Sequence, residues 1–121
     1  MEPISQFFER YLAAWDSPEK LAGFYHEPFL AARGGSVRLN ATRKDAVAFF
    51  SEVDKGYRAK GMRSGKLLAI DARELGTSAA AAIIQWAYQD RGGNTLWEST
   101  FTYNLYSVGG VWKIVLQTMH E

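Results

Sequence analysis

The chain has 121 residues, no cysteine, and 14 basic against 13 acidic side chains, which gives a net charge of +1. A chain of this length forms one domain, residues 1–121, around a single hydrophobic core, and the lack of cysteine excludes disulfides and thiolate metal sites. The balanced charge, without basic runs interleaved with aromatic residues, argues against nucleic-acid binding. Aromatic residues make up 14% of the chain, so they either fill the core or line a cavity for an apolar ligand.

The N-terminal segment, residues 1–16, mixes charged and apolar residues instead of forming a continuous apolar run. It therefore matches neither a signal peptide nor a membrane span. Together with the lack of cysteine, this leads us to expect a cytoplasmic protein with no membrane partner.

Two helices are predicted at the start of the chain. Pro3 suits the first turn of a helix, where its missing N–H costs nothing, and apolar residues then recur at helical spacing. That stripe comprises Ile4, Phe7, Phe8, Tyr11, Leu12 and Trp15. Ser17 as N-cap and Pro18 at the first helical position predict a second, short helix that ends near Phe24.

A short hairpin and a long helix follow. Pro28 disfavours helix at the residue before it, and residues 28–40 read as a hairpin around a Gly-Gly turn. Thr42 and Asp45 have the spacing of a reciprocal capping box, which predicts the start of the long helix, and Gly61 is expected to end it. The buried stripe of this helix is expected to comprise Ala46, Val47, Phe50, Val53 and Tyr57.

The second half of the chain is predicted to form an antiparallel sheet. Its β-rich runs cover residues 66–72, 78–89, 95–108 and 111–121, and turn-forming segments separate them. The predicted fold class is therefore α+β, with the helices packed on a curved antiparallel sheet.

The Gly109-Gly110 turn is expected to fix the register of the last hairpin, with Tyr103 opposite Leu116. One face then points toward the helices and carries Trp97, Ser99, Phe101, Tyr103, Leu105, Trp112, Ile114, Leu116, Thr118 and His120, with Ala82, Ile84, Trp86 and Tyr88 on the neighbouring strand. This face predicts an aromatic-rich interior closed by the helices.

The opposite face is poor in charge. Its expected members are Glu98, Thr100, Thr102, Asn104, Tyr106, Lys113, Val115, Gln117 and Met119, with Ile83, Gln85, Ala87 and Gln89 alongside. Two interpretations remain open: a homodimer interface, which suits a neutral face of amides, threonines and apolar side chains, or an ordinary solvent-facing sheet.

Three stretches of the chain resemble the nuclear transport factor 2-like superfamily, the α+β cone with a cystatin-like fold that includes SnoaL-like polyketide cyclases and ketosteroid isomerases. They are "FFERYLAAWDSPEKLAGFY", "TRKDAVAFF" and "YNLYSVGGVWKIVLQTMH". The resemblance spans nearly the whole chain and implies the fold. It implies no particular activity, because this superfamily hosts enzymes, binders and scaffolds alike.

The resemblance to ketosteroid isomerases implies an oxyanion-donor role for Tyr11 and places a second donor near Thr102 or Tyr103. The stretch that corresponds to the general base offers Ala31, Ala32 and Arg33 but no carboxylate. The isomerase set is therefore incomplete, and the sequence does not support transfer of that reaction.

Few other residues suit acid–base chemistry. His26 can reach a cavity mouth or lie on the surface, and His120 can point inward or lie in a frayed or interfacial end. Arg33 can meet an anionic ligand or be solvated at a strand end. No metal site is expected from two histidines without a nearby inward carboxylate, and no motif implies a cofactor.

Two functions follow as hypotheses. The first is a pocket that binds a hydrophobic or aromatic small molecule, with lyase-, isomerase- or cyclase-like chemistry as an open possibility. Its expected ligand-binding residues are Tyr11, Trp15, His26, Phe50, Trp86, Trp97, Phe101, Tyr103, Trp112 and His120. The second is a homodimeric scaffold that uses the outer sheet face. A cavity of several hundred cubic ångströms favours the first, and a solid core the second.

Overall fold

The computed structural model of the protein describes residues 1–121. It contains three helices and six strands: α1 (Ile4–Ala13), α2 (Pro18–Ala22), β1 (Tyr25–Arg33), β2 (Ser36–Asn40), α3 (Arg43–Ala59), β3 (Ser64–Leu75), β4 (Ala79–Gln89), β5 (Thr95–Val108) and β6 (Val111–Met119). The predicted order of helices, hairpin, long helix and sheet is confirmed. None of the three helices has the length and apolar character needed to cross a membrane.

The helix boundaries follow the predicted capping residues. The hydroxyl of Ser17 accepts a hydrogen bond from the backbone N–H of Lys20 at the start of α2. Thr42 and Asp45 form the reciprocal capping box of α3. Past the end of α3, Gly61 adopts a φ of 99°, which favours glycine. Local sequence therefore sets where α3 begins and ends, and so which of its residues face the sheet.

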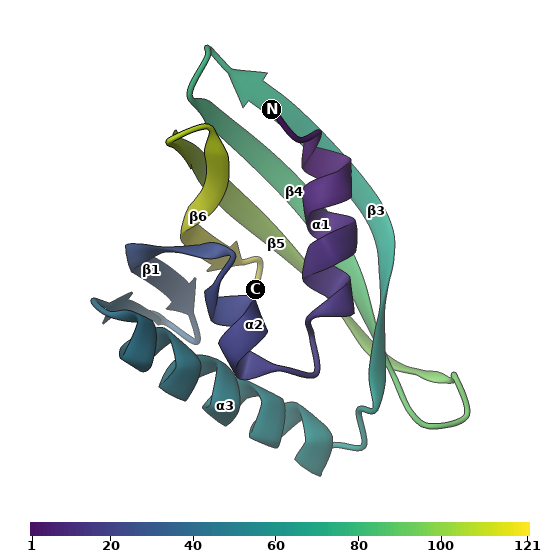
Figure 1. Ribbon diagram of the computed structural model, residues 1–121. Coiled ribbons are helices and arrows are strands. Elements are labelled where there is room, and N and C mark those ends of the chain that lie inside the picture. The colour runs from purple at the N-terminus through teal and green to yellow at the C-terminus, as the bar shows by residue number, and fades with distance from the viewer.

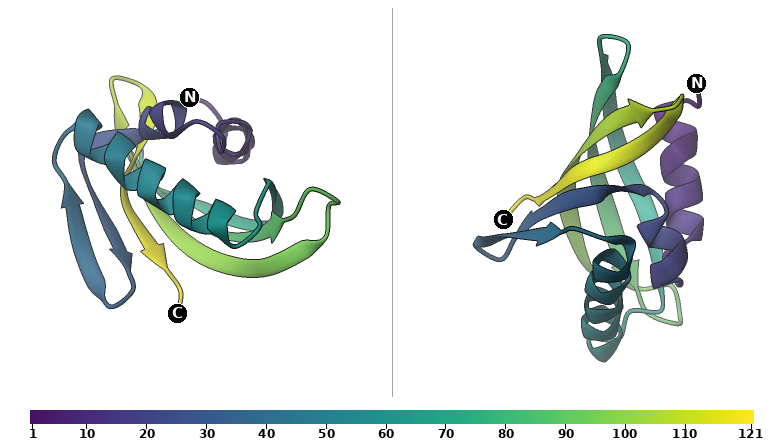
Figure 2. Two further views of the ribbon diagram at one scale, coloured as in Figure 1. Left: turned by 90° about the horizontal axis from the view of Figure 1, so that it is seen from below. Right: turned by 60° about the vertical axis from the view of Figure 1, so that its left-hand side comes forward.

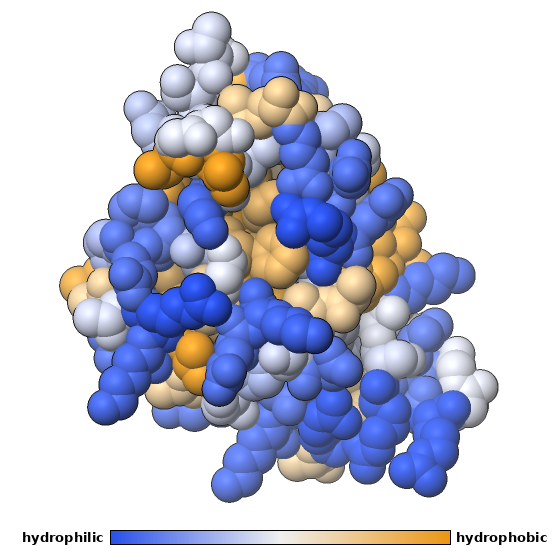
Figure 3. All heavy atoms as spheres, in the orientation of Figure 1, coloured by the Kyte–Doolittle hydropathy of each residue, from blue (hydrophilic) through white to orange (hydrophobic).

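The strands form one curved sheet in the order β2-β1-β6-β5-β4-β3. The three helices cover its concave face, and the opposite face carries no helix (Figures 1 and 2). On the covered side the helices turn hydrophilic residues outward, with apolar atoms visible near the centre (Figure 3). The fold is thus an α+β cone with its interior between helices and sheet.

One strand pair differs from the expected antiparallel arrangement. β1 runs parallel to β6 and antiparallel to β2, so the hairpin residues join the sheet next to the C-terminal strand. β1 also begins at Tyr25, three residues before the predicted hairpin. This pairing joins segments about 85 residues apart, such as Ala31 and Gln117, which local sequence patterns do not encode.

A bulge in β6 overturns the predicted register of the last hairpin. Leu105 pairs with Ile114 and Asn104 with Leu116, so Val115 is the additional residue. Tyr103 therefore lies opposite Gln117, not Leu116. Because side chains alternate between the two faces of a strand, the bulge exchanges the faces of every residue after it.

Five predicted placements on β6 and after it are consequently wrong. Gln117 and Met119 belong to the inner face, where Gln117 is buried and Met119 packs against the core. Leu116, Thr118 and His120 belong to the outer face, since Thr118 pairs with Thr102. The interior gains a buried amide and loses the histidine that the alternation predicted.

The interior is packed with aromatic rings from helices and sheet. In α1, Phe8 has no exposed surface and packs at a tilt against the rings of Tyr11 and Tyr103. From the other side, Phe50 of α3 packs on Tyr25. In α3 the buried residues include Phe49, which the predicted stripe omits, whereas Val47, Val53 and Tyr57 are partly exposed.

Candidate functional site

A cavity lies inside the cone between α1, α3 and the inner face of the sheet. Six of the ten expected ligand-binding residues line it: Tyr11, Trp15, Phe50, Trp86, Phe101 and Tyr103. Its volume is about 60 Å³, and the cavity together with the open space at its mouth measures about 500 Å³. We call this space the pocket. The interior is therefore neither solid nor hollowed to the several hundred cubic ångströms typical of drug-sized ligands.

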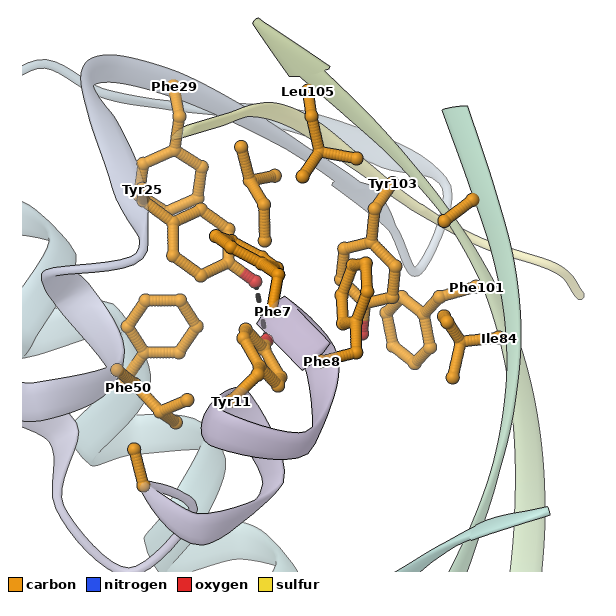
Figure 4. Packing of buried hydrophobic residues seen from close by; sticks show 14 of the residues in the cluster. Phe7, Phe8, Tyr11, Tyr25, Phe29, Phe50, Ile84, Phe101, Tyr103 and Leu105 are labelled. Carbon is orange, nitrogen blue, oxygen red and sulfur yellow. Dashed lines mark hydrogen bonds between the residues drawn. The ribbon is translucent and has the colours of Figure 1, made fainter. Parts of the chain in front are cut away.

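Hydroxyl groups meet at the back of the pocket. The hydroxyl oxygens of Tyr11 and Tyr25 lie 2.6 Å apart (Figure 4). The amide nitrogen of Gln117 donates to the Tyr25 hydroxyl over 2.7 Å. Either hydroxyl of the Tyr11–Tyr25 pair can be the donor, and the Tyr25 oxygen also accepts from Gln117.

Tyr103 and Trp86 form a second buried polar pair. The indole nitrogen of Trp86 donates to the hydroxyl oxygen of Tyr103 over 2.9 Å. The Tyr103 oxygen thus accepts from Trp86, and the Tyr103 hydroxyl also interacts with that of Tyr11, so the two polar pairs adjoin.

Burial keeps these tyrosines neutral. Loss of solvent raises the pKa of Tyr11 well above the usual value for tyrosine, and the neighbouring Tyr25 raises it further. Burial likewise raises the pKa of Tyr25 and Tyr103. At physiological pH the back of the pocket therefore presents hydroxyl donors rather than phenolate bases.

One buried polar atom of the pocket has no partner in the protein. Gln117 is 3% exposed, and while its amide nitrogen is bonded to Tyr25, its carbonyl oxygen Oε1 makes no hydrogen bond. Gln117 lines the pocket. An unpaired buried acceptor carries a free-energy cost that a ligand with a hydrogen-bond donor would remove.

Charged groups occur near the mouth. The Arg33 guanidinium donates to the Tyr57 hydroxyl over 2.7 Å and lies 5.8 Å from the ring centres of Tyr57 and Phe101. Asp54 also lines the pocket, but Arg58 one helical turn away holds its carboxylate at 3.0 Å. The lining therefore contains one carboxylate, already paired, and one arginine without an acidic partner.

Trp15 forms a wall of the pocket across β3. Its ring stacks on Tyr88 with 5.4 Å between centroids, and it approaches Gly65 so closely that a Cβ there would lie 1.7 Å from the indole. Position 65 thus requires glycine because of the tryptophan, and the partly exposed Trp15 is held over the strand.

Four of the expected ligand-binding residues do not line the pocket. Trp97 stacks behind Tyr88, one layer from the lining. Trp112 is buried near the β5–β6 turn, where its indole donates to the backbone of Glu2. The bulge turns His120 to the outer face, where its Nε2 atom lies 2.7 Å from the Thr102 hydroxyl. His26 bonds to the carbonyl of Pro28, two residues further on.

The lining also contains residues absent from the expected set: Leu21, Arg33, Val53, Asp54, Tyr57, Met62, Tyr88 and Gln117. Tyr57 belongs to the helical stripe, and Tyr88 to the strand face, that the sequence pattern predicted to point inward. Both could therefore have been included in the expected set. Gln117 becomes inward only through the bulge, and Arg33 through the pairing of β1 with β6.

As a chemical environment, the pocket offers aromatic walls, hydroxyl donors, one free acceptor and one cation. No histidine lies on its lining, and its carboxylate is engaged by Arg58. The arrangement is equipped to bind and orient a ligand, and less equipped to abstract a proton.

Comparison with known proteins identifies the fold. A family model described as NTF2-like protein (DUF6841) matches residues 1–121. No curated protein matches the sequence significantly.

Solved structures resemble the chain at low sequence identity. An NTF2-like protein of unknown function from Shewanella oneidensis has a TM-score of 0.74 and 17% identity, with 96% of its chain and 98% of this one covered. An NTF2-like protein with a cystatin-like fold from Novosphingobium aromaticivorans has a TM-score of 0.75 and 18% identity, with 77% of its chain and 96% of this one covered.

A protein of unknown function with a cystatin-like fold from Nostoc punctiforme has a TM-score of 0.78 and 11% identity, with 86% of its chain and 96% of this one covered. At such identities the likeness concerns the fold alone. Matched over its whole length by the family model, the chain belongs to the NTF2-like family DUF6841 and has the cystatin-like α+β fold that these structures share.

Proposed function

We propose that the protein binds a small, largely apolar molecule in the pocket. The observation that carries this proposal is the unpartnered Oε1 atom of Gln117 in an aromatic-lined cavity. A core evolved only for packing gains nothing from a buried acceptor without a donor. A ligand that donates to this oxygen and places its apolar body against Trp86 and Tyr103 offsets that cost.

The size of the pocket limits the ligand. Its 60 Å³ is less than half of the roughly 150 Å³ cavity known to hold benzene. A planar ligand larger than a few heavy atoms therefore has to extend toward the mouth, past the partly exposed Trp15 and Tyr57.

The geometry supports binding better than catalysis. Tyr11 and Tyr103 can donate to a developing oxyanion, which is the part of the chemistry that an isomerase-, lyase- or cyclase-like reaction would need. The lining offers neither a histidine nor an unpaired carboxylate as its base. We therefore propose ligand binding, and not catalysis, as the function of the pocket.

Ligand-observed NMR screening with a library of small aromatic compounds tests the proposal. Val53 lines the pocket from α3, so Val53→Phe should fill the cavity and remove binding while the fold is retained. Lys55→Phe, at an exposed position of the same helix, is the matched control and should bind normally. A library without hits, or hits that Val53→Phe leaves unchanged, would refute a ligand site here.

A second proposal concerns assembly: the protein forms a homodimer through the outer sheet face. Leu30 of β1 pairs with Leu39 of β2 on one side and with Leu116 of β6 on the other, and Leu116 pairs with Asn104 of β5. This row crosses four strands without a charged side chain. Leu30 and Leu39 are exposed, and burying such a strip against a second copy is favourable.

Leu116→Lys should weaken the dimer, because it places two lysines near the two-fold axis. Val108→Lys, at an exposed position by the β5–β6 turn, is the control. Light scattering should give twice the chain mass of 13.6 kDa for the wild type and the control, and a shift toward 13.6 kDa for Leu116→Lys. A monomeric wild type at micromolar concentration would leave the face as plain solvent surface.

A further inference from the structure

We infer that the ligand of the pocket is a small carboxylic acid, whose carboxylate binds Arg33 and whose flat body carries a hydrogen-bond donor facing Gln117. This inference rests on the proposed binding function and narrows it to a chemical class. It follows from two independent features of the lining, an arginine without an acidic partner and a buried acceptor without a donor.

Arg33 is positioned to bind an anion. None of the four ion pairs of the protein involves it. Its Nη2 atom donates to Tyr57, which uses one of its five N–H donors. The nearby rings of Tyr57 and Phe101 hold the planar guanidinium in place, so little conformational freedom remains to be lost when an anion binds.

The charge of Arg33 reaches the back of the pocket. Burial raises the pKa of Tyr25 and Tyr88, and the positive charge of Arg33 acts in the opposite direction on both. The other charged groups on the lining and its edge are Asp54 and Arg58, which neutralise one another. Arg33 therefore sets the sign of the field that a ligand meets.

The sheet places Arg33 and Gln117 on the same inner face. Ala31 pairs with Gln117 across β1 and β6, and Arg33 lies two residues further along β1. Both side chains line the pocket, so a single molecule bound there can meet the Arg33 guanidinium and the Gln117 amide.

A carboxylate fits better than a phosphate. The guanidinium matches a carboxylate in plane and can bind it through two parallel hydrogen bonds. A phosphate dianion calls for more than one cation, and Arg58 is already engaged by Asp54. The aromatic lining also favours an ion whose remaining atoms are apolar.

Calorimetric titration with 4-hydroxybenzoate and its neutral isostere 4-hydroxybenzamide tests the role of Arg33. The wild type should bind the acid about tenfold or more tightly than the amide. Arg33→Met should remove this preference while both compounds still bind, and Arg33→Lys should retain part of it. Arg38→Met, on the adjacent strand, is the control and should keep the full preference.

The outcomes separate this inference from the proposed function. Equal binding of acid and amide to the wild type would overturn the inference and leave the pocket as a site for neutral ligands. Binding of neither compound would overturn it together with the proposed function, provided that the NMR screen is also blank. Displacement of the acid by inorganic phosphate at equal concentration would contradict the carboxylate class.

Substitution of Gln117 tests whether the ligand donates a hydrogen bond to this residue. The wild type should bind 4-hydroxybenzoate about threefold or more tightly than benzoate, because only the former can donate to Oε1. Gln117→Met should equalise the two acids without affecting the preference for acid over amide. A Gln117→Met variant that still prefers the hydroxylated acid would place the donor elsewhere in the pocket.

Discussion

The side-chain amide of Gln117 donates to the hydroxyl of Tyr25 over 2.7 Å, which fastens the last strand to the first inside the core. The same amide leaves its oxygen without a partner. Gln117 thus contributes a stabilising hydrogen bond and a destabilising unpaired oxygen. This combination is typical of sites where binding is favoured over stability.

Replacement of Gln117 by methionine should change the free energy of unfolding by less than about 1 kcal/mol, because the lost hydrogen bond is offset by removal of the unpaired oxygen. Tyr25 keeps its contact with Tyr11 in this variant. Urea denaturation of both proteins measures the difference. A loss of about 3 kcal/mol or more would show that Gln117 is essential to the core and not a residue kept for a ligand.

Alkaline pH should destabilise the protein steeply. Burial raises the pKa of Tyr11, Tyr25, Tyr88 and Tyr103 in the folded chain. Unfolded tyrosines lose their protons near pH 10, so this stabilisation is present below about pH 10 and is lost as the pH rises beyond it. Each tyrosine that stays protonated lowers the free energy of unfolding by about 1.4 kcal/mol per pH unit there.

Lys113 has the opposite effect on the pH dependence of stability. Burial, with Arg43 and Arg10 nearby, lowers its pKa. The folded state therefore binds this proton less tightly, and the resulting penalty is relieved as the pH rises toward the unfolded pKa. One lysine does not outweigh four tyrosines. Urea midpoints should fall above about pH 10, and a flat profile there would contradict the burial of the tyrosine cluster.

The contact between Trp15 and Gly65 predicts strong coupling. Gly65→Ala should expel Trp15 from the wall and cost about 1–3 kcal/mol, because a Cβ would lie 1.7 Å from the indole. Trp15→Ala should cost about 3 kcal/mol or less, since the side chain is partly exposed, and should weaken ligand binding.

In the Gly65→Ala, Trp15→Ala double variant the clash is absent. Its destabilisation should therefore be about 1 kcal/mol or more below the sum of the two single effects. Urea denaturation of the four proteins completes the cycle. Additive losses would mean that Trp15 does not rest on Gly65 in solution.

The sequence encodes the elements of this fold locally. Thr42 and Asp45 predict the start of α3, and the Gly109-Gly110 turn predicts the last hairpin, because capping and turn chemistry depend on residues a few positions apart. The aromatic walls were also predictable, since Tyr11 and Trp86 lie on regular helical and strand periods.

The polar part of the site was not predictable in the same way. A single added residue at Val115 moves Gln117 inward and His120 outward, and no local pattern marks such a bulge. Arg33 points into the pocket only because β1 joins β6. The residues that distinguish a binding pocket from a packed core thus depend on bulges and long-range pairing.

The central claim, that the interior of the cone holds a ligand, is tested most directly by a crystal structure of the protein soaked with small aromatic acids. We predict ordered density against Trp86 and Tyr103, with a donor at the Oε1 atom of Gln117 and a carboxylate at Arg33. A structure in which the soaked compounds lie only on the outer surface, while the cavity holds water alone, would contradict the account.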